Sequence, residues 1–181
     1  MNVEEGEPSP SRASPPARGW SHLIEEQLEE MGWTAGLLQT MGDRLVRAAS
    51  PEARELGSEL KRHAAGLRRL REGALQRALE VVRDASERWV NDAEWTFVGK
   101  ALRTCGEAME TAARGYVDGA RSLPNLDGEL RTVPGEMLII SCLVEERGGQ
   151  MRRLGDRLLA LTEGERIGLS GTRTARKPSV G

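Results

Sequence analysis

The residues between Leu56 and Trp89 include an apolar set that recurs at intervals of three and four. This spacing places the set on one face of an α-helix, which has about 3.6 residues per turn. The stripe consists of Leu56, Leu60, His63, Leu67, Leu70, Ala74, Ala78, Val81, Ala85 and Trp89. A stripe of this length needs other helices to cover it, so the chain is expected to fold by packing long helices together.

The same spacing is found in three further segments, which start near Trp20, Asn91 and Pro134. The expected helices are 20–49, 51–90, 92–117 and 134–162, with a loop over 118–133 that contains several glycines and prolines. Ser50 and Pro51 suit a helix start. Either one helix of about 65 residues runs on from Pro51, or two helices meet near Asn91. A capping pattern of Asn91 with Glu94 favours two helices.

Composition agrees with a helical bundle that has few aromatic contacts. The 181 residues are 38% hydrophobic, 30% charged and only 3% aromatic. The sequence therefore predicts an all-α fold, an elongated helical bundle or antiparallel coiled coil of three to four long amphipathic helices. The helical domain is expected over 19–163. Residues 1–18 and 164–181 are rich in proline, glycine and polar residues, so both ends are expected to be disordered tails.

The net charge and the cysteines of the sequence indicate which kinds of partner the protein binds and in which cell compartment it lies. A formal charge of −2 gives no overall basic field, so no nucleic acid is expected as a partner and membrane association is not favoured. The longest strongly apolar run, Met137 to Val144, is far shorter than the roughly 20 residues that span a bilayer as a helix. Cys105 and Cys142 have no disulfide or metal spacing, which is typical of a cytoplasmic or nuclear protein.

Residues that could support catalysis are few. His22 and His63 have no second metal ligand at a suitable spacing, and adjacent carboxylates such as Glu25 and Glu26 point to different sides of a helix. Nucleophile-elbow and phosphate-loop patterns are absent from the sequence. The sequence predicts a protein that is not an enzyme and that has no cofactor or metal.

One short pattern, Gly-Asp-Arg-Leu, occurs in both the first and the last expected helix. The two candidate segments consist of Leu38, Met41, Gly42, Asp43 and Leu45, and of Met151, Leu154, Gly155, Asp156 and Leu158. A glycine inside a helix costs about 1 kcal/mol relative to alanine, which suggests that two helices approach closely there. Each aspartate is then expected to pair with an arginine across the contact.

These segments resemble the BH3 segment of Bcl-2 family proteins, an amphipathic helix that binds in a hydrophobic groove. The resemblance covers about a dozen residues. It implies that Met151, Leu154 and Leu158 are anchors, that Gly155 is a close-contact position and that Asp156 meets an arginine of the groove. The rhythm of leucines from Met41 to Trp89 is also similar to the first helix of BAR-type domains, which implies a peripheral membrane-binding module.

Trp95 and Phe97 lie off the apolar stripe, so at least one of them is expected to face outward onto a partner. Together the patterns favour a non-enzymatic helical adaptor, or a subunit of a larger assembly, that binds proteins through helical faces and could form a homo-oligomer. A BH3-like regulator and a BAR-like membrane module are the alternatives. The twelve candidate residues for protein binding are the ten of the two Gly-Asp-Arg-Leu segments, together with Trp95 and Phe97.

Overall fold

The computed structural model of the chain describes residues 17–85, 90–123, 126 and 128–171, and every secondary-structure element in these ranges is helical. The long elements are α1 (Ala17–Leu45), α2 (Pro51–Leu70), α3 (Gln76–Asp84), α4 (Asp92–Ser122) and α5 (Val133–Gly171). Two short elements are η1, a π-helical turn (Arg71–Leu75), and η2, a 3-10 turn (Gly128–Leu130). The predicted all-α class is confirmed.

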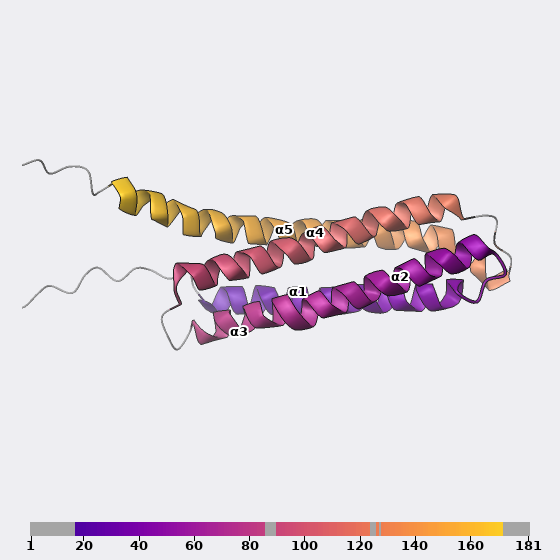
Figure 1. Ribbon diagram of the computed structural model, residues 1–181, viewed down its shortest axis with the longest axis horizontal. Coiled ribbons are helices and arrows are strands. Elements are labelled where there is room, and N and C mark those ends of the chain that lie inside the picture. The colour runs from indigo at the N-terminus through magenta and orange to yellow at the C-terminus, as the bar shows by residue number, and fades with distance from the viewer. Residues whose placement is uncertain (1–16, 86–89, 124–125, 127, 172–181) are drawn as a thin grey trace, which may run out of the picture.

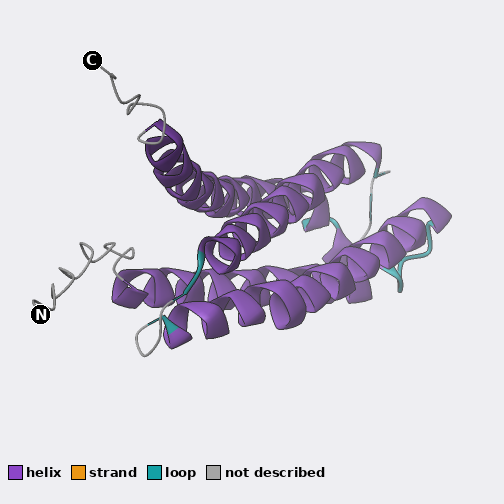
Figure 2. Ribbon diagram, turned by 60° about the vertical axis from the view of Figure 1, so that its left-hand side comes forward, coloured by secondary structure: helices purple, strands orange, loops and turns teal. Residues whose placement is uncertain are grey.

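The helices form an elongated bundle of antiparallel rods (Figures 1 and 2). Because η1 joins α2 to α3 without a break, these three elements make one rod, and α1, α4 and α5 are the others. α1 packs most extensively on the α2–α3 rod, and α4 packs most extensively on α5. No helix in the described part of the chain is long and apolar enough to cross a membrane.

Two helices begin at the capping residues seen in the sequence. The Ser50 hydroxyl accepts a hydrogen bond from the Ala53 backbone N–H at 3.3 Å, and Pro51 occupies the first turn of α2. Asn91 and Glu94 form a reciprocal capping box, with hydrogen bonds of 3.0 and 2.9 Å. α3 ends at Asp84 and α4 begins at Asp92, so two helices occupy the region where one long helix was the alternative.

The core is built from rows of side chains that recur every seven residues. A spacing of seven keeps a row on one face of a helix over many turns, as in coiled coils. On α1 and α5, every side chain in these rows is at most 1% exposed. The α1 row consists of Ile24, Met31, Leu38 and Leu45, and the α5 row consists of Met137, Val144, Met151 and Leu158. The corresponding row on α4 carries larger side chains, namely Trp95, Leu102, Met109 and Tyr116.

The π-helical turn η1 rotates the buried face of the second rod by one residue. Before η1, Leu60 and Leu67 are buried as expected. After it, the buried residues are Leu75, Ala78, Leu79 and Val82, whereas the expected Ala74, Val81 and Ala85 are only partly buried. A π turn holds one residue more than an α turn, and the Gln76 N–H accordingly bonds to the Arg71 carbonyl oxygen, five residues earlier. Beyond η1 the expected stripe is therefore wrong at Ala74, Val81 and Ala85, whereas Ala78 is buried as expected.

His63 is exposed, so its expected place on the buried stripe is also wrong. A buried imidazole needs hydrogen-bond partners to replace water, and here the ring stays at the edge of the α2–α4 contact. Trp89, the last expected member of the stripe, lies outside the described residues.

Helix ends differ from the expected bounds at several places. α1 ends at Leu45, before the expected 49, and α4 continues to Ser122 through the expected loop. Gly119, taken as a loop residue, is buried in α4, where an added Cβ would meet Leu56 Cδ1 at 2.6 Å. α5 runs to Gly171 instead of 162, because extending an existing helix is much easier than starting one. The rest of the expected tails, 1–16 and 172–181, lies outside the described residues.

Candidate protein-interaction site

Both Gly-Asp-Arg-Leu segments lie where two helix backbones touch. An added Cβ at Gly42 of α1 would be 2.7 Å from the carbonyl oxygen of Gly57 in α2, and one at Gly155 of α5 would be 2.6 Å from that of Gly99 in α4. Real Cβ atoms do not come this close to backbone atoms, so only glycine fits at these positions. The expected close approach is therefore present twice, once in each tightly packed helix pair.

The aspartate after each glycine pairs with a cation on the opposite helix. Asp156 Oδ1 lies 3.8 Å from Nε of Arg103, as expected for an aspartate–arginine pair. Asp43 Oδ1 instead lies 2.8 Å from Nζ of Lys61, so the expectation of an arginine is wrong there. The Lys61 hydrogen bond holds the pKa of Asp43 below its ordinary value. Lys61 follows Gly57 by four residues, and Arg103 follows Gly99 by four residues. Each cation therefore lies on the same face of its helix as the glycine that precedes it.

The apolar residues of the two segments belong to the core of the bundle. Leu38, Met41, Leu45, Met151 and Leu158 are each at most 5% exposed, and Leu154 is partly buried. The two segments lie in different helix pairs, so the structure does not bring them together into one site. Of the aromatic candidates, Trp95 is buried and Phe97 is 36% exposed, so one of the two faces outward.

Apart from Gly155, sequence reasoning missed the small residues that line the whole α4–α5 seam. They recur every seven residues, as Gly99, Gly106, Ala113 and Ala120 on α4 and as Ser141, Gly148, Gly155 and Thr162 on α5. All eight are buried. The closest approach is at Gly106, where an added Cβ would lie 2.5 Å from the Gly148 carbonyl oxygen. The seven-residue recurrence of glycine was visible in the sequence and could have located this seam.

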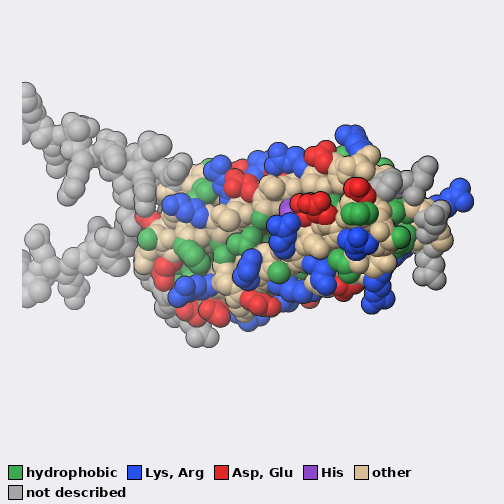
Figure 3. Space-filling view, turned by 45° about the vertical axis from the view of Figure 1, so that its right-hand side comes forward, with side chains coloured by type: hydrophobic (Ala, Val, Ile, Leu, Met, Phe, Trp, Pro, Cys, Tyr) green, Lys and Arg blue, Asp and Glu red, His purple; other side chains and the backbone are tan. Residues whose placement is uncertain are grey.

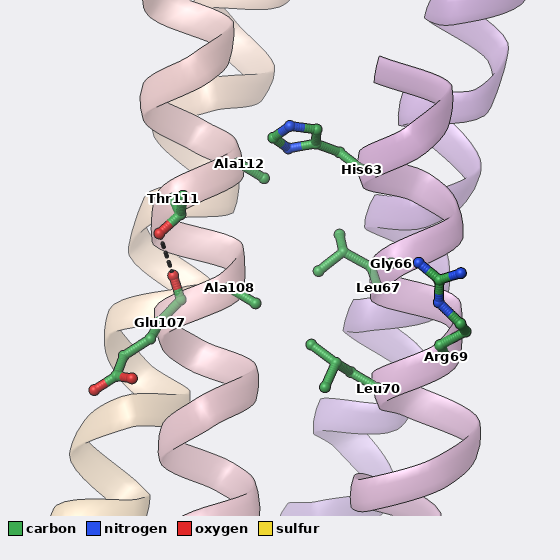
Figure 4. Close-up of a pocket in the computed structure, with 9 residues that line it drawn as sticks. All are labelled: His63, Gly66, Leu67, Arg69, Leu70, Glu107, Ala108, Thr111 and Ala112. Atoms are coloured by element: carbon green, nitrogen blue, oxygen red, sulfur yellow. Dashed lines mark hydrogen bonds between the residues drawn. The ribbon is translucent and has the colours of Figure 1, made fainter. Parts of the chain in front are cut away.

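Two openings in the surface lie next to each other between α2 and α4, and we name them together the α2–α4 groove. It has an apolar half of about 590 Å³, lined by His63, Gly66, Leu67, Arg69, Leu70, Glu107, Ala108, Thr111 and Ala112. Leu67 and Leu70 point from α2 toward Ala108 and Ala112 of α4 across the gap (Figure 4). Because the facing residues are small, the two helices leave a gap between them, in which Leu67 and Ala112 are buried and Leu70 and Ala108 are partly buried.

The acidic half of the α2–α4 groove lies nearer the start of α2. It has a volume of about 510 Å³ and is lined by Glu52, Glu55, Leu56, Glu59, Gly115, Asp118, Gly119 and Ser122. All four carboxylate side chains are exposed. Charged side chains of both signs and patches of apolar side chains share the face of the molecule seen in Figure 3. The groove thus combines an apolar stretch with a negatively charged stretch.

Two ion pairs and one cation–π contact join α1 to α5. Arg147 of α5 lies over the ring of Trp33, with 4.3 Å from Cζ to the ring centroid, and also pairs with Glu30. Arg44 of α1 forms an ion pair with Glu136 near the start of α5. These pairs fix how α1 and α5 align along their lengths. Close-packed glycines do not contribute to this contact.

The ion pair of Arg44 with Glu136 predicts a small, pH-dependent contribution to stability. Hydrogen bonds from Arg44 and Thr132 lower the pKa of Glu136 below its ordinary value of 4.5. A lowered folded-state pKa stabilises the fold above the unfolded pKa, and the stabilisation is lost as pH falls through the folded pKa. We expect Glu136→Gln to cost less than about 1 kcal/mol at pH 7, because the pair is well exposed to solvent.

Urea unfolding of the wild type and Glu136→Gln across pH 2–7 would measure this difference. It should shrink toward zero at the acid end, and it should be smaller at pH 7 in an Arg44→Met background. A cost that stays constant with pH would contradict the assignment.

Within the described ranges, no group of three or more His, Cys, Asp and Glu side chains is placed to hold a metal ion. Comparison of the chain with protein-family models, with curated proteins and with solved structures gives no match. The geometry of the bundle and of its surface is therefore the basis for a functional proposal.

Proposed function

We propose that this chain is a non-enzymatic adaptor, or a subunit of a larger assembly, that binds a partner protein through helix–helix contacts in the α2–α4 groove. The observation that carries the proposal is the open apolar half of this groove, about 590 Å³ between two long helices. Grooves between helices are a common way to bind a further helix.

The lining residues favour a partner helix with large apolar side chains. Gly66, Ala108 and Ala112 occupy little space, and Leu67 with Leu70 provides an apolar floor. A partner helix could place one large side chain per turn into this opening, at intervals of three and four residues. The burial of such side chains contributes most of the affinity in interfaces of this kind.

The acidic half of the groove specifies the charge of the partner. Glu55 and Asp118 face the same opening from α2 and α4, with Glu52 and Glu59 beside them. A helix with lysine or arginine residues at one end and apolar residues at the other matches the two halves. Exposed charges of this kind contribute more to orientation and association rate than to affinity.

The BH3-like alternative uses the face of α5 that carries Met151, Gly155 and Leu158, and α4 covers that face here. It would require α5 to separate from α4, whereas docking in the α2–α4 groove requires no such opening. We also propose that the adaptor acts in the cytoplasm, which its two free cysteines, Cys105 and Cys142, support.

Affinity purification of the full chain from its native cells, with quantitative mass spectrometry, tests the proposal. Ala108→Trp fills the apolar half of the groove, and Glu55→Lys combined with Asp118→Lys reverses the charge of the acidic half. Glu29→Lys combined with Glu80→Lys is the matched control, because both residues are exposed and neither lines the groove. Circular dichroism verifies that each variant keeps its helix content.

We expect a stoichiometric partner to copurify with the wild type and the control, and to fall at least tenfold with both groove variants. A stoichiometric partner that stays bound to both groove variants would rule out docking in the α2–α4 groove. Recovery of no stoichiometric partner with the wild type would contradict the adaptor function itself.

A further inference from the structure

α5 carries an apolar face that no other described helix covers, and we name it the α5 patch. It consists of Leu138, Ile139, Cys142 and Leu143, which lie on two successive turns. Ile139 is 67% exposed, the largest exposure among the large hydrophobic side chains of the described residues, and Leu138 and Leu143 are 42% and 38% exposed. Met137 and Val144 on the same turns are fully buried, so the α5 patch faces away from the core.

The two ends of the α5 patch differ in charge. At its N-terminal end lie Arg131, which is exposed, and the first turn of α5, whose backbone dipole gives this end a partial positive charge. The one acidic side chain of that turn, Glu136, is paired with Arg44 of the same chain. At its C-terminal end lie Glu145 and Glu146, both exposed. The α5 patch is thus an apolar centre with a positive end and a negative end.

Such a surface is complementary to itself when one copy is turned end to end. A two-fold axis between Ile140 and Ser141 places Leu138 opposite Leu143 of the second copy, and Ile139 opposite Cys142. The same axis places Glu146 opposite Gly135, in the first turn of α5. Gly135 is exposed and an added Cβ there would meet nothing within 4 Å, so the carboxylate can approach the Gly135 backbone N–H.

We propose that this chain forms a two-fold symmetric dimer through the α5 patch, with the two α5 helices antiparallel. A two-fold contact uses the same patch on both copies, so apolar surface is covered and opposite charges meet at both ends. The dimer does not depend on the proposed function, because the α2–α4 groove is built from α2 and α4 and contains no α5 residue.

Sedimentation velocity of the full chain over a range of concentrations tests the dimer. The wild type should reach twice the 19.8 kDa mass of one chain. Ile139→Glu should raise the dissociation constant at least tenfold, because it introduces a charge at the centre of the interface. Leu161→Glu is the matched control. Leu161 is also an exposed apolar residue of α5, 48% exposed, but lies outside the α5 patch, so this variant should stay dimeric.

Circular dichroism of both variants verifies that they remain folded. A wild type that stays monomeric at 100 µM would overturn the dimer. A folded Ile139→Glu variant that dimerises as tightly as the wild type would overturn the role of the α5 patch.

Oxidative cross-linking tests the antiparallel register. Leu138→Cys and Leu143→Cys are each made in a Cys142→Ser background, which leaves Cys105 as the one native thiol. Cys105 does not interfere, because it is buried and burial raises the pKa of its thiol to about 12. One variant is labelled uniformly with ¹⁵N and mixed with the other, unlabelled variant. The mixed disulfide dimer, identified by its intermediate mass, should be the main product. Equal or greater cross-linking of either variant with itself would overturn the register.

Discussion

Replacing Gly106 with alanine should lower the free energy of unfolding by about 1–3 kcal/mol, although alanine is the better helix former. The added Cβ would lie 2.5 Å from the Gly148 carbonyl oxygen and 2.6 Å from the Arg152 backbone nitrogen. Backbone atoms of a long helix cannot move aside individually, so α4 and α5 must separate locally. Urea unfolding followed by circular dichroism measures the change, and Tm should fall by about 2–4 °C per kcal/mol.

Gly36→Ala is the matched control for Gly106→Ala. Gly36 also lies inside a long helix, α1, but an added Cβ there would meet nothing within 4 Å. We therefore expect the free energy of unfolding to rise by up to about 1 kcal/mol, the difference in helix propensity. If both substitutions changed stability in the same direction, the steric account of the α4–α5 seam would be wrong.

Deleting Gly73 should leave the bundle folded and within about 1 kcal/mol of the wild type, whereas deleting Thr104 should destroy cooperative unfolding. Gly73 lies in η1, and an added Cβ at this position would meet nothing within 4 Å. Its removal turns the π turn into an α turn and brings Leu60, Leu67, Leu75 and Val82 to a regular seven-residue spacing. Removing a glycine from the interior of a helix also stabilises the helix.

Thr104 is also exposed, but it lies in α4, where the described residues contain no π turn to absorb the change. Its deletion rotates one part of α4 by about 100° against the other. Leu102 and Met109 then cannot face the core together, and we expect a loss of more than about 4 kcal/mol. Thermal melts of both deletions measure the contrast, and a Gly73 deletion as damaging as that of Thr104 would show that η1 is itself required.

Periodicity in the sequence was sufficient for the fold class and for the helix starts at Pro51 and Asp92. Steps of three and four define a helical face, and the capping residues Ser50 and Asn91 act locally, so both kinds of signal can be found without knowing the tertiary structure. The shift at η1 was missed for a related reason. A pattern that allows intervals of both three and four residues also allows the buried face to shift by one residue. The sequence therefore could not show whether Ala74 or Leu75 is buried.

The candidate site was less accessible from the sequence, because it depends on which helices are neighbours. The Gly-Asp-Arg-Leu repeats indicated close contacts, but they did not indicate that Asp43 would face Lys61. The α2–α4 groove arises from residues nearly 50 positions apart, such as Leu67 and Ala112, whose separation depends on the packing of the whole bundle. Gly119 was taken as a loop residue because glycine favours turns, yet it lies in a helix beside Leu56.

The pairing of α1 with α2, and of α4 with α5, has a consequence for how the chain folds. In both pairs the tightest contacts join helices that follow each other in the sequence, across connections of 46–50 and 123–132. Closing a short connection costs little entropy, and contacts between consecutive segments form quickly. We therefore expect each hairpin to form early in folding, and the docking of the two hairpins along their larger side chains to be the slower step.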